Sequence, residues 1–351
     1  MRACTSLIIA SLLVIAASPA VAADGGYYNP VHPDVSIYEP GQKAIIAWNG
    51  EQEVLILSVD IWAEENNWVL ELVPFPSLPT VEAGEFESFY QVDTVLNSRM
   101  YSWLDRLAPG KLAGEGENFD ILFQENIGAH YITVAFATSA QSLVTFIENL
   151  WLTHMGPGEF SWTRLQNLAA SYIERDIQYW AIDMLNLNDY LKSREPLVYT
   201  FKTDYLYFPL EISSLGTGET RINLYTITLE NTDNYPIERA GLSKGSFWVG
   251  WEAENRENFP IEFRITQDEL GQISSKVAEL FDNGAWLTAW YYYGELDGLR
   301  GNFVILASTT SETPSAIVQP VGGPSRLPEI ALAGLVIVLE LEIFVLVWRR
   351  K

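Results

Sequence analysis

The stretch KAIIAWNGEQEVLILSV, residues 43–59, decides the fold class of this chain. Two apolar runs rich in β-formers, residues 43–48 and 54–59, flank the pair Asn49-Gly50. Asn-Gly tolerates the positive φ angles of a tight turn, so the stretch predicts an antiparallel β-hairpin.

Similar signals extend outward from the hairpin. Strands are predicted for the apolar runs at residues 68–73, 130–137, 177–185, 197–201, 206–212, 221–229, 246–251 and 261–265. Helices are predicted for residues 85–107, for two segments between residues 139 and 174, and for a segment that follows the capping box of Thr266 and Glu269. Residues 285–292 and 302–307 are expected to form a closing hairpin, and Gly216-Thr217-Gly218 a hairpin turn between two strands. Because strands outnumber helices without alternating with them, the predicted class is α+β, with a mainly antiparallel sheet and a few packed helices.

Composition restricts the class of protein and of partner. The chain has 351 residues, of which 48% are hydrophobic and 13% aromatic, so most of it is expected to fold. Acidic residues outnumber basic ones 45 to 21, which gives a formal net charge of −24. Such an acidic protein would repel nucleic acid and anionic lipid, so neither is expected as a main partner.

Residues 1–22 are predicted to be a signal peptide. The apolar stretch at residues 7–17 is too short to cross a bilayer as a helix, and Ala20-Val21-Ala22 has the small-x-small pattern of a signal peptidase site. Cleavage is therefore expected between Ala22 and Ala23, ahead of an extracytoplasmic domain over residues 23–319. The single cysteine, Cys4, would leave with the signal peptide, which excludes disulfides and thiol chemistry from the mature chain.

The C-terminal end is predicted to be a membrane anchor. A linker over residues 320–328 precedes an apolar helix over residues 329–348, whose span runs from Ile330 to Trp348. The length of this span matches the hydrocarbon core of a bilayer, and the basic tail at residues 349–351 favours a cytoplasmic C-terminus. The expected location is thus the cell membrane, with a single pass and the N-terminal domain at the cell surface.

Two acidic residues complicate this prediction. Glu340 and Glu342 lie near the middle of the span, so insertion is nearly balanced unless they are protonated or meet a partner transmembrane helix. One alternative is a buried or peripheral helix. Another is a sorting signal, because the Pro-Glu motif at Pro328, the apolar run and the basic tail resemble C-terminal signals that a sorting transpeptidase reads and removes.

No pattern in the sequence assigns a catalytic, cofactor-binding or metal-binding residue. The three histidines, His32, His130 and His154, do not share metal-ligand spacing, and the sequence has no nucleophile elbow of a serine hydrolase. Two acidic loops would offer oxygen ligands to calcium, although neither matches a complete calcium-binding loop. Their residues are Glu115, Glu117, Asn118 and Asp120 in one loop and Asp233 and Asn234 in the other.

A proline-rich segment is the candidate recognition loop. Pro74, Phe75, Pro76, Leu78 and Pro79 are expected to form a stiff, extended loop, because three prolines within six residues cannot serve a central strand. The loop would act either as a preformed recognition surface or as a structural crossover whose apolar side chains pack inward.

Four stretches, taken in order, resemble a known family. They are ADGGYY at residues 23–28, PGQKAII at 40–46, Trp68 with PFPSLP at 74–79, and YTFKTDYLYFPL at 199–210. Together they resemble the prokaryotic domain-of-unknown-function 2330 family of exported, uncharacterised proteins, over most of residues 23–240. The resemblance implies export and frequent membrane attachment. It implies no activity, so no functional residue carries over.

Two functions from different classes follow. The leading hypothesis is a membrane-anchored binding protein or cell-envelope component without a catalytic site. The alternative is an extracytoplasmic hydrolase of the glycosidase type, because acidic residues are plentiful and such enzymes use two carboxylates about 5–9 Å apart. Spacing in the sequence does not show whether two carboxylates meet across a cleft.

Overall fold

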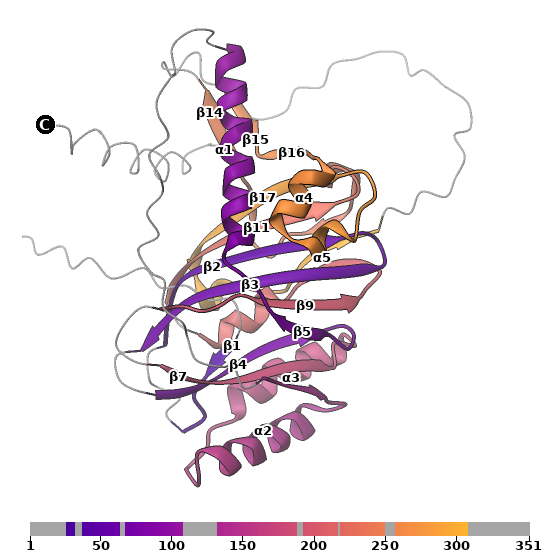
Figure 1. Ribbon diagram of the computed structural model, residues 1–351. Coiled ribbons are helices and arrows are strands. Elements are labelled where there is room, and N and C mark those ends of the chain that lie inside the picture. The colour runs from indigo at the N-terminus through magenta and orange to yellow at the C-terminus, as the bar shows by residue number, and fades with distance from the viewer. Residues whose placement is uncertain are drawn as a thin grey trace, which may run out of the picture. The chain divides into compact units, whose positions relative to one another are not determined.

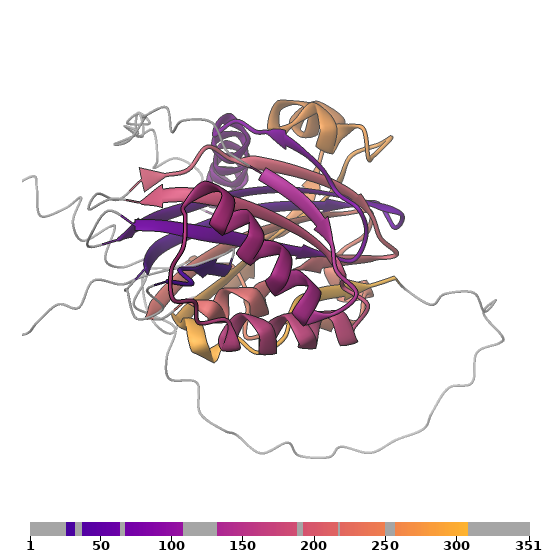
Figure 2. The ribbon, with the colours of Figure 1, turned by 90° about the horizontal axis from the view of Figure 1, so that it is seen from below.

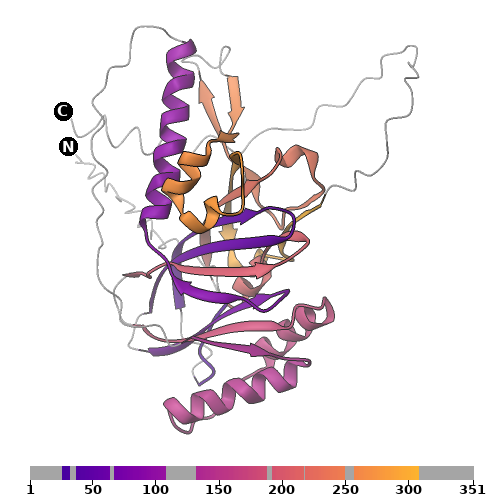
Figure 3. The same cartoon turned by 45° about the vertical axis from the view of Figure 1, so that its right-hand side comes forward.

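A computed structural model describes residues 26–31, 37–63, 67–107, 132–187, 192–216, 218–249 and 257–307. All of them belong to one compact unit, Met1–Ser308, and a second unit, Thr309–Lys351, lies outside the described residues. Within the first unit two sheets pack face to face, and helices cover the outer face of each sheet, as Figure 1 and Figure 3 show. The α+β part of the predicted fold class is therefore confirmed.

The larger sheet is built around the predicted hairpin. Strands β2 and β3 pair in antiparallel register across the Asn49-Gly50 turn, where Gly50 has a φ of 97° and the Asn49 side chain accepts the Gln52 amide at 2.9 Å. Strand β11 runs parallel to β2, whereas the other strand pairs among the described residues are antiparallel. The order is β13-β17-β11-β2-β3-β9-β5, with β16 on β17 and β8 on β3. The bounds are Ile37–Trp48 (β2), Gln52–Ala63 (β3), Thr80–Ala83 (β5), Lys192–Ser193 (β8), Leu197–Lys202 (β9), Glu219–Thr228 (β11), Ser243–Lys244 (β13), Glu262–Ile265 (β16) and Ala285–Glu295 (β17).

The smaller sheet has the strand order β1-β4-β7-β6. Its strands are Gly26–Tyr28 (β1), Asn67–Phe75 (β4), Ile132–Phe136 (β6) and Tyr179–Leu187 (β7). Helices α2 (Ala140–His154) and α3 (Thr163–Glu174) cover its outer face, which Figure 2 shows from the side of these helices. The Tyr172 ring of α3 meets Trp180 of β7 edge-on at 5.7 Å. As predicted, Ser139 caps α2 by accepting the Ser142 amide.

Two further sheets and three further helices complete the described unit. Strands β10 (Tyr205–Phe208), β18 (Phe303–Leu306) and β12 (Ile237–Glu238) form one sheet, and β14 (Ser246–Val249) pairs with β15 (Glu257–Pro260). Helices α1 (Glu87–Leu107), α4 (Gln267–Ile273) and α5 (Ser275–Ala278) lie on the outer face of the larger sheet. Short 3₁₀ helices span Leu210–Leu215, Thr232–Asn234 and Leu296–Gly298.

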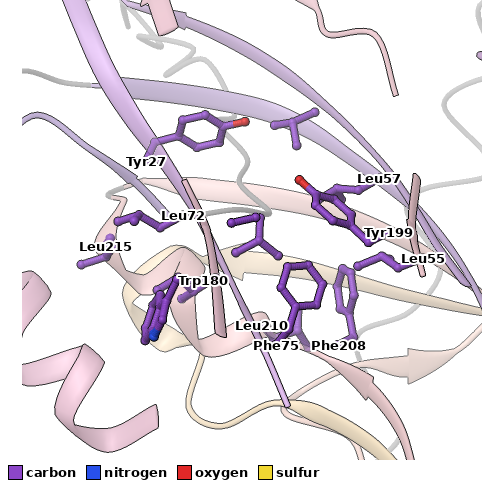
Figure 4. Packing of buried hydrophobic residues seen from close by; sticks show 14 of the residues in the cluster. Tyr27, Leu55, Leu57, Leu72, Phe75, Trp180, Tyr199, Phe208, Leu210 and Leu215 are labelled. Atoms are coloured by element: carbon purple, nitrogen blue, oxygen red, sulfur yellow. The ribbon is translucent and has the colours of Figure 1, made fainter. Parts of the chain in front are cut away.

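Two hydrophobic cores flank the larger sheet, because successive side chains of a strand point to opposite faces. On β2, Ile46 belongs to the core between the two sheets, whereas Ile45 packs in the core beneath α1, α4 and α5. Figure 4 shows part of the first core, where Phe75 of β4 lies against Tyr199 of β9.

Four local predictions are wrong. The expected closing hairpin does not form: both edges of β17 are already occupied by β11, β13 and β16, so β18 pairs with β10 and β12 instead. The strand expected over residues 206–212 ends at Phe208, because Pro209 lacks the amide hydrogen that a ladder needs. The helix after Thr266 has the predicted capping box but breaks at Ser274, whose φ of −166° is extended and not helical.

Residues 216–218 do not join two strands either. They connect the 3₁₀ helix Leu210–Leu215 to β11, and Thr217 lies outside the described residues.

The prediction of a C-terminal transmembrane helix does not stand. No helix in the described part of the chain is long and apolar enough to cross a membrane. The expected span from Ile330 to Trp348, with Glu340 and Glu342, lies outside the described residues. The structure therefore does not support a single-pass location in the cell membrane or the membrane as a partner. It does not support the pairing of Glu340 and Glu342 with a partner transmembrane helix either.

Candidate functional site

The structure does bring two carboxylates together, but between the two sheets. Glu71 of β4 and Asp183 of β7 are directly opposite each other in the smaller sheet and face the larger one. Arg194 donates to Glu71 Oε2 at 2.7 Å and to Asp183 Oδ2 at 2.9 Å, and the Tyr27 hydroxyl donates to Glu71 Oε1 at 2.7 Å. Glu71, Asp183 and Arg194 are each at most 5% exposed. A glycoside could not approach these carboxylates without separating the sheets.

The electrostatics of this buried cluster agree with an inert role. Burial lowers the pKa of Arg194, but the charges of Glu71 and Asp183 and the nearby Tyr27 outweigh it, so that the pKa is raised. Burial and the same two carboxylates raise the pKa of Tyr199 well above its ordinary value. Figure 4 shows the Tyr27 and Tyr199 hydroxyls turned toward the same region. The cluster thus holds an ion pair and the neutral phenol of Tyr199 between the two sheets, and it links β4 and β7 to Arg194 beside β8.

Glu53 is a third buried carboxyl group, distinct from that cluster. Its Oε2 accepts the Tyr207 amide at 2.7 Å, and no donor among the described residues reaches its Oε1. Burial raises the pKa of Glu53 well above its ordinary value, although the bond from Tyr207 lowers it in part. Because the side chain has no solvent contact, it also has no access to a substrate.

The proline-rich segment divides into a buried part and an exposed part. Pro74 and Phe75 are the last residues of β4, and Phe75 packs against Tyr199 and Phe201 with ring centroids 4.9 and 5.1 Å apart. Leu78, in contrast, is 64% exposed. Pro76 and Pro79 lie in the connection between β4 and β5. Of the two apolar side chains Phe75 and Leu78, the first therefore belongs to the core and the second faces solvent.

The calcium candidates do not converge. Residues 115–120 lie outside the described residues, whereas Asp233 receives the Lys244 ammonium at 2.8 Å. Lys244 also contacts Glu262 at 3.0 Å, so a side-chain cation already occupies the place beside Asp233 that a calcium ion would take. The Asn234 amide donates to Glu230. Among the stretches that the structure describes, no three acidic, histidine or cysteine side chains gather as a metal site, and of the histidines only His154 is described.

A surface groove between β6 and α2 is the candidate site that the structure offers instead. It encloses about 300 Å³, at the small end of the range for ligand pockets. Phe136 of β6 is 56% exposed and Phe146 of α2 is 39% exposed. No lining residue carries a charge: they are Thr133, Val134, Ala135, Phe136, Ala137, Ser142, Leu143 and Phe146.

The backbone of β6 is the polar wall of this groove. In the smaller sheet β6 is an edge strand that pairs with β7 alone among the described residues. The Ala137 amide donates to the Gln178 carbonyl at 2.9 Å, in line with the β6–β7 register. Since antiparallel partners alternate between bonded and non-bonded pairs, Thr133 and Ala135 also bond to β7. The N–H and C=O groups of Ile132, Val134 and Phe136 consequently point away from β7, toward the edge of the sheet that no described strand covers.

A second hollow of about 290 Å³ lies between α3 and the 3₁₀ helix Leu210–Leu215. Its one basic lining group, Arg164, donates to the carbonyls of Ser214 and Gly216. Glu211, the acidic lining group, is paired with Arg175. With both charges engaged by the fold, this hollow offers no free recognition group of either sign.

Sequence reasoning missed the groove although it found both of its elements. Residues 130–137 were expected as a strand and Phe146 as part of an inward apolar helix face, yet Phe146 lies at the margin of that face. The available signal was the lack of any charged residue in ITVAF, the sequence of β6. An acidic residue within an otherwise apolar strand, as at Glu71 and Asp183, was likewise the signal for the buried cluster.

Comparisons with known proteins leave the family open. No family model matches the sequence, and no curated protein matches it either. The chain is similar to solved structures of baculovirus P35: the crystal structure of P35 at 11% identity and a TM-score of 0.43, covering 78% of this chain and 97% of that one. A mutated P35 after caspase cleavage gives 11% identity and a TM-score of 0.33, with coverages of 76% and 99%. P35 in its complex with caspase-8 gives 11% and 0.30, with coverages of 80% and 99%. At these scores the likeness does not establish a common fold, and no property of P35 is transferred to this chain.

Proposed function

We propose that this protein is a non-catalytic binding protein that captures an extended segment of another polypeptide by adding it as a strand to β6. The observation that carries the proposal is the outward-pointing backbone of Ile132, Val134 and Phe136 beside an uncharged, largely apolar groove. Strand addition satisfies such backbone groups, and pockets for alternate side chains supply the specificity.

The composition of β6 supports this use of the edge. Edge strands are normally protected from pairing by charged residues, proline or covering elements. Edge strand β5 of the larger sheet follows this rule, since its Glu82 is paired with Lys276 at 2.6 Å. Strand β6 has neither charge nor proline and exposes Phe136, which rests on Tyr179 with ring centroids 5.0 Å apart. An unprotected edge of this kind is suited to a partner strand.

The hydrolase alternative has weaker support. Of the buried carboxyl groups, Glu71 and Asp183 are engaged by one guanidinium, and Glu53 has no solvent contact. Export, on which an extracytoplasmic or cell-envelope role rests, remains a prediction from residues 1–22.

One proline substitution in each of two edge strands, β6 and β5, tests the proposal. Val134→Pro removes an outward amide without breaking a bond to β7 and places a ring on the open edge. Val81→Pro of β5 is the matched control: the Gly84 amide bonds to the Pro196 carbonyl at 2.6 Å, so by the same alternation the Val81 amide also points outward.

The probe is the fluorescently labelled peptide QTVTVFTVQ, followed by anisotropy. We expect binding to the unaltered chain and to Val81→Pro, and loss of at least about tenfold in affinity for Val134→Pro. Phe146→Ser should weaken binding while circular dichroism stays unchanged. No binding to the unaltered chain, or equal binding by both proline variants, would overturn the proposal.

A further inference from the structure

The partner of the β6 groove has a definable chemistry, on the condition that the proposed function holds. We infer that the captured segment is a basic one: an extended stretch of uncharged, largely apolar residues with lysine or arginine at its flanks.

The apolar part follows from the walls of the groove. Side chains of an added strand alternate between the two faces of the smaller sheet. On the helix side they would meet Phe146, Leu143 and Ser142, and on the other side they would lie beside Val134 and Phe136. None of these groups carries a charge, and a charged side chain pressed against them would lose hydration that they replace only in small part. The central residues of the ligand are therefore uncharged.

The basic flanks follow from the charge of the whole chain. Its formal net charge is −24, so the potential around the molecule attracts cations over several ångströms beyond the surface. Helix α2, the outer wall of the groove, contains one acidic residue, Glu148, and no lysine or arginine. Flanking residues of the ligand leave the groove and enter this field, where positive charge speeds association and stabilises the encounter.

The same charge argues against a second copy of this chain. Pairing two β6 edges about a twofold axis is geometrically open to any antiparallel edge strand, but it would bring together two bodies of charge −24. Neither groove would gain an opposite charge from its partner. A basic segment of another protein would pair with the backbone of β6 and would also be attracted by the negative charge of the chain.

Three peptides with a common core and different flanks test the inference. They are KTVTVFTVK, QTVTVFTVQ and ETVTVFTVE, each titrated into the full chain at about 50 mM and about 500 mM salt. We expect the lysine peptide to bind at least about tenfold more tightly than the glutamate peptide at low salt, with the glutamine peptide between them and the spread collapsing at high salt.

The outcomes separate this inference from the proposed function. If all three peptides bind equally at low salt and Val134→Pro abolishes the binding, strand capture stands and the basic partner is refuted. If none binds at either salt concentration, the proposed function itself fails. If sedimentation shows that the chain dimerises and that Val134→Pro makes it monomeric, the occupant is a second copy and the inference is overturned.

Discussion

Glu53 carries a pH dependence that a single residue can reveal. Because burial raises its pKa, the folded chain retains a proton that the unfolded chain releases above about pH 4.3. The contribution of Glu53 to the free energy of unfolding is therefore fully present below its pKa in the unfolded chain. It decreases as the pH rises toward the pKa of Glu53 in the folded chain. We expect Glu53→Gln to stabilise the chain more at about pH 8 than at about pH 5, as measured by urea denaturation.

The neighbouring exposed residue provides the control for this measurement. Glu51→Gln, two positions earlier on the same hairpin, should leave the difference between the two pH values as it is in the unaltered chain. If Glu53→Gln shows the same pH slope as the unaltered chain, Glu53 is not held in its protonated form.

Arg194 should be one of the costlier single substitutions in the molecule. Arg194→Met would leave Glu71 and Asp183 buried without their guanidinium, and breaking a buried pair in this way costs about 3–5 kcal/mol. Arg175→Met removes an ion pair with Glu211 near the surface and should cost less than about 1 kcal/mol. Equal shifts of the denaturation midpoint for the two variants would contradict the structural role of the cluster.

The buried cluster also shows what the sequence does not reveal at this scale. Glu71 and Asp183 each interrupt an apolar strand, which marks them as buried acids in need of a partner. The partner, Arg194, is 123 residues from Glu71 in the chain. No local sequence pattern connects Glu71 with Arg194, because their contact depends on the packing of one sheet on the other.

At the scale of elements, the proline-rich segment yields a paired prediction. Phe75 is fully buried between two aromatic rings, so Phe75→Ala should cost about 3–5 kcal/mol of stability. Leu78→Ser replaces an exposed side chain and should change stability by no more than about 0.5 kcal/mol. Thermal denaturation of both variants checks the difference. A stable Phe75→Ala chain would mean that this segment does not anchor β4.

Elements with local signals could be predicted from the sequence, and their partners could not. Asn49-Gly50 determined the β2–β3 hairpin and Ser139 the start of α2, because turns and caps involve residues only a few positions apart. Strands β18 and β10 pair although they are roughly a hundred residues apart in the chain. This pairing could not be predicted locally, because it depends on both edges of β17 being occupied by other strands. The groove likewise depends on strand order, since β6 is a candidate site only because that order places it at an edge of the smaller sheet.

At the scale of the whole molecule, the predicted maturation is consistent with the position of β1. Cleavage between Ala22 and Ala23 would leave Gly26–Tyr28 in the mature chain, where Tyr27 reaches Glu71 across the sheet. We expect N-terminal sequencing of the protein purified from its native cells to begin at Ala23. Retention of Met1 would refute cleavage, and a first residue at or beyond Tyr28 would contradict the role of β1, because the mature chain would then lack Tyr27.

The central claim is that β6 receives a partner strand, and residue-resolved hydrogen exchange tests it most directly. Adding KTVTVFTVK should slow exchange of the outward amides of Ile132, Val134 and Phe136, since each would gain a hydrogen bond. The Thr133 and Ala135 amides, already bonded to β7, should change little. Uniform protection along β6, no protection at all, or outward amides that are already slow in the free chain would contradict strand addition at this edge.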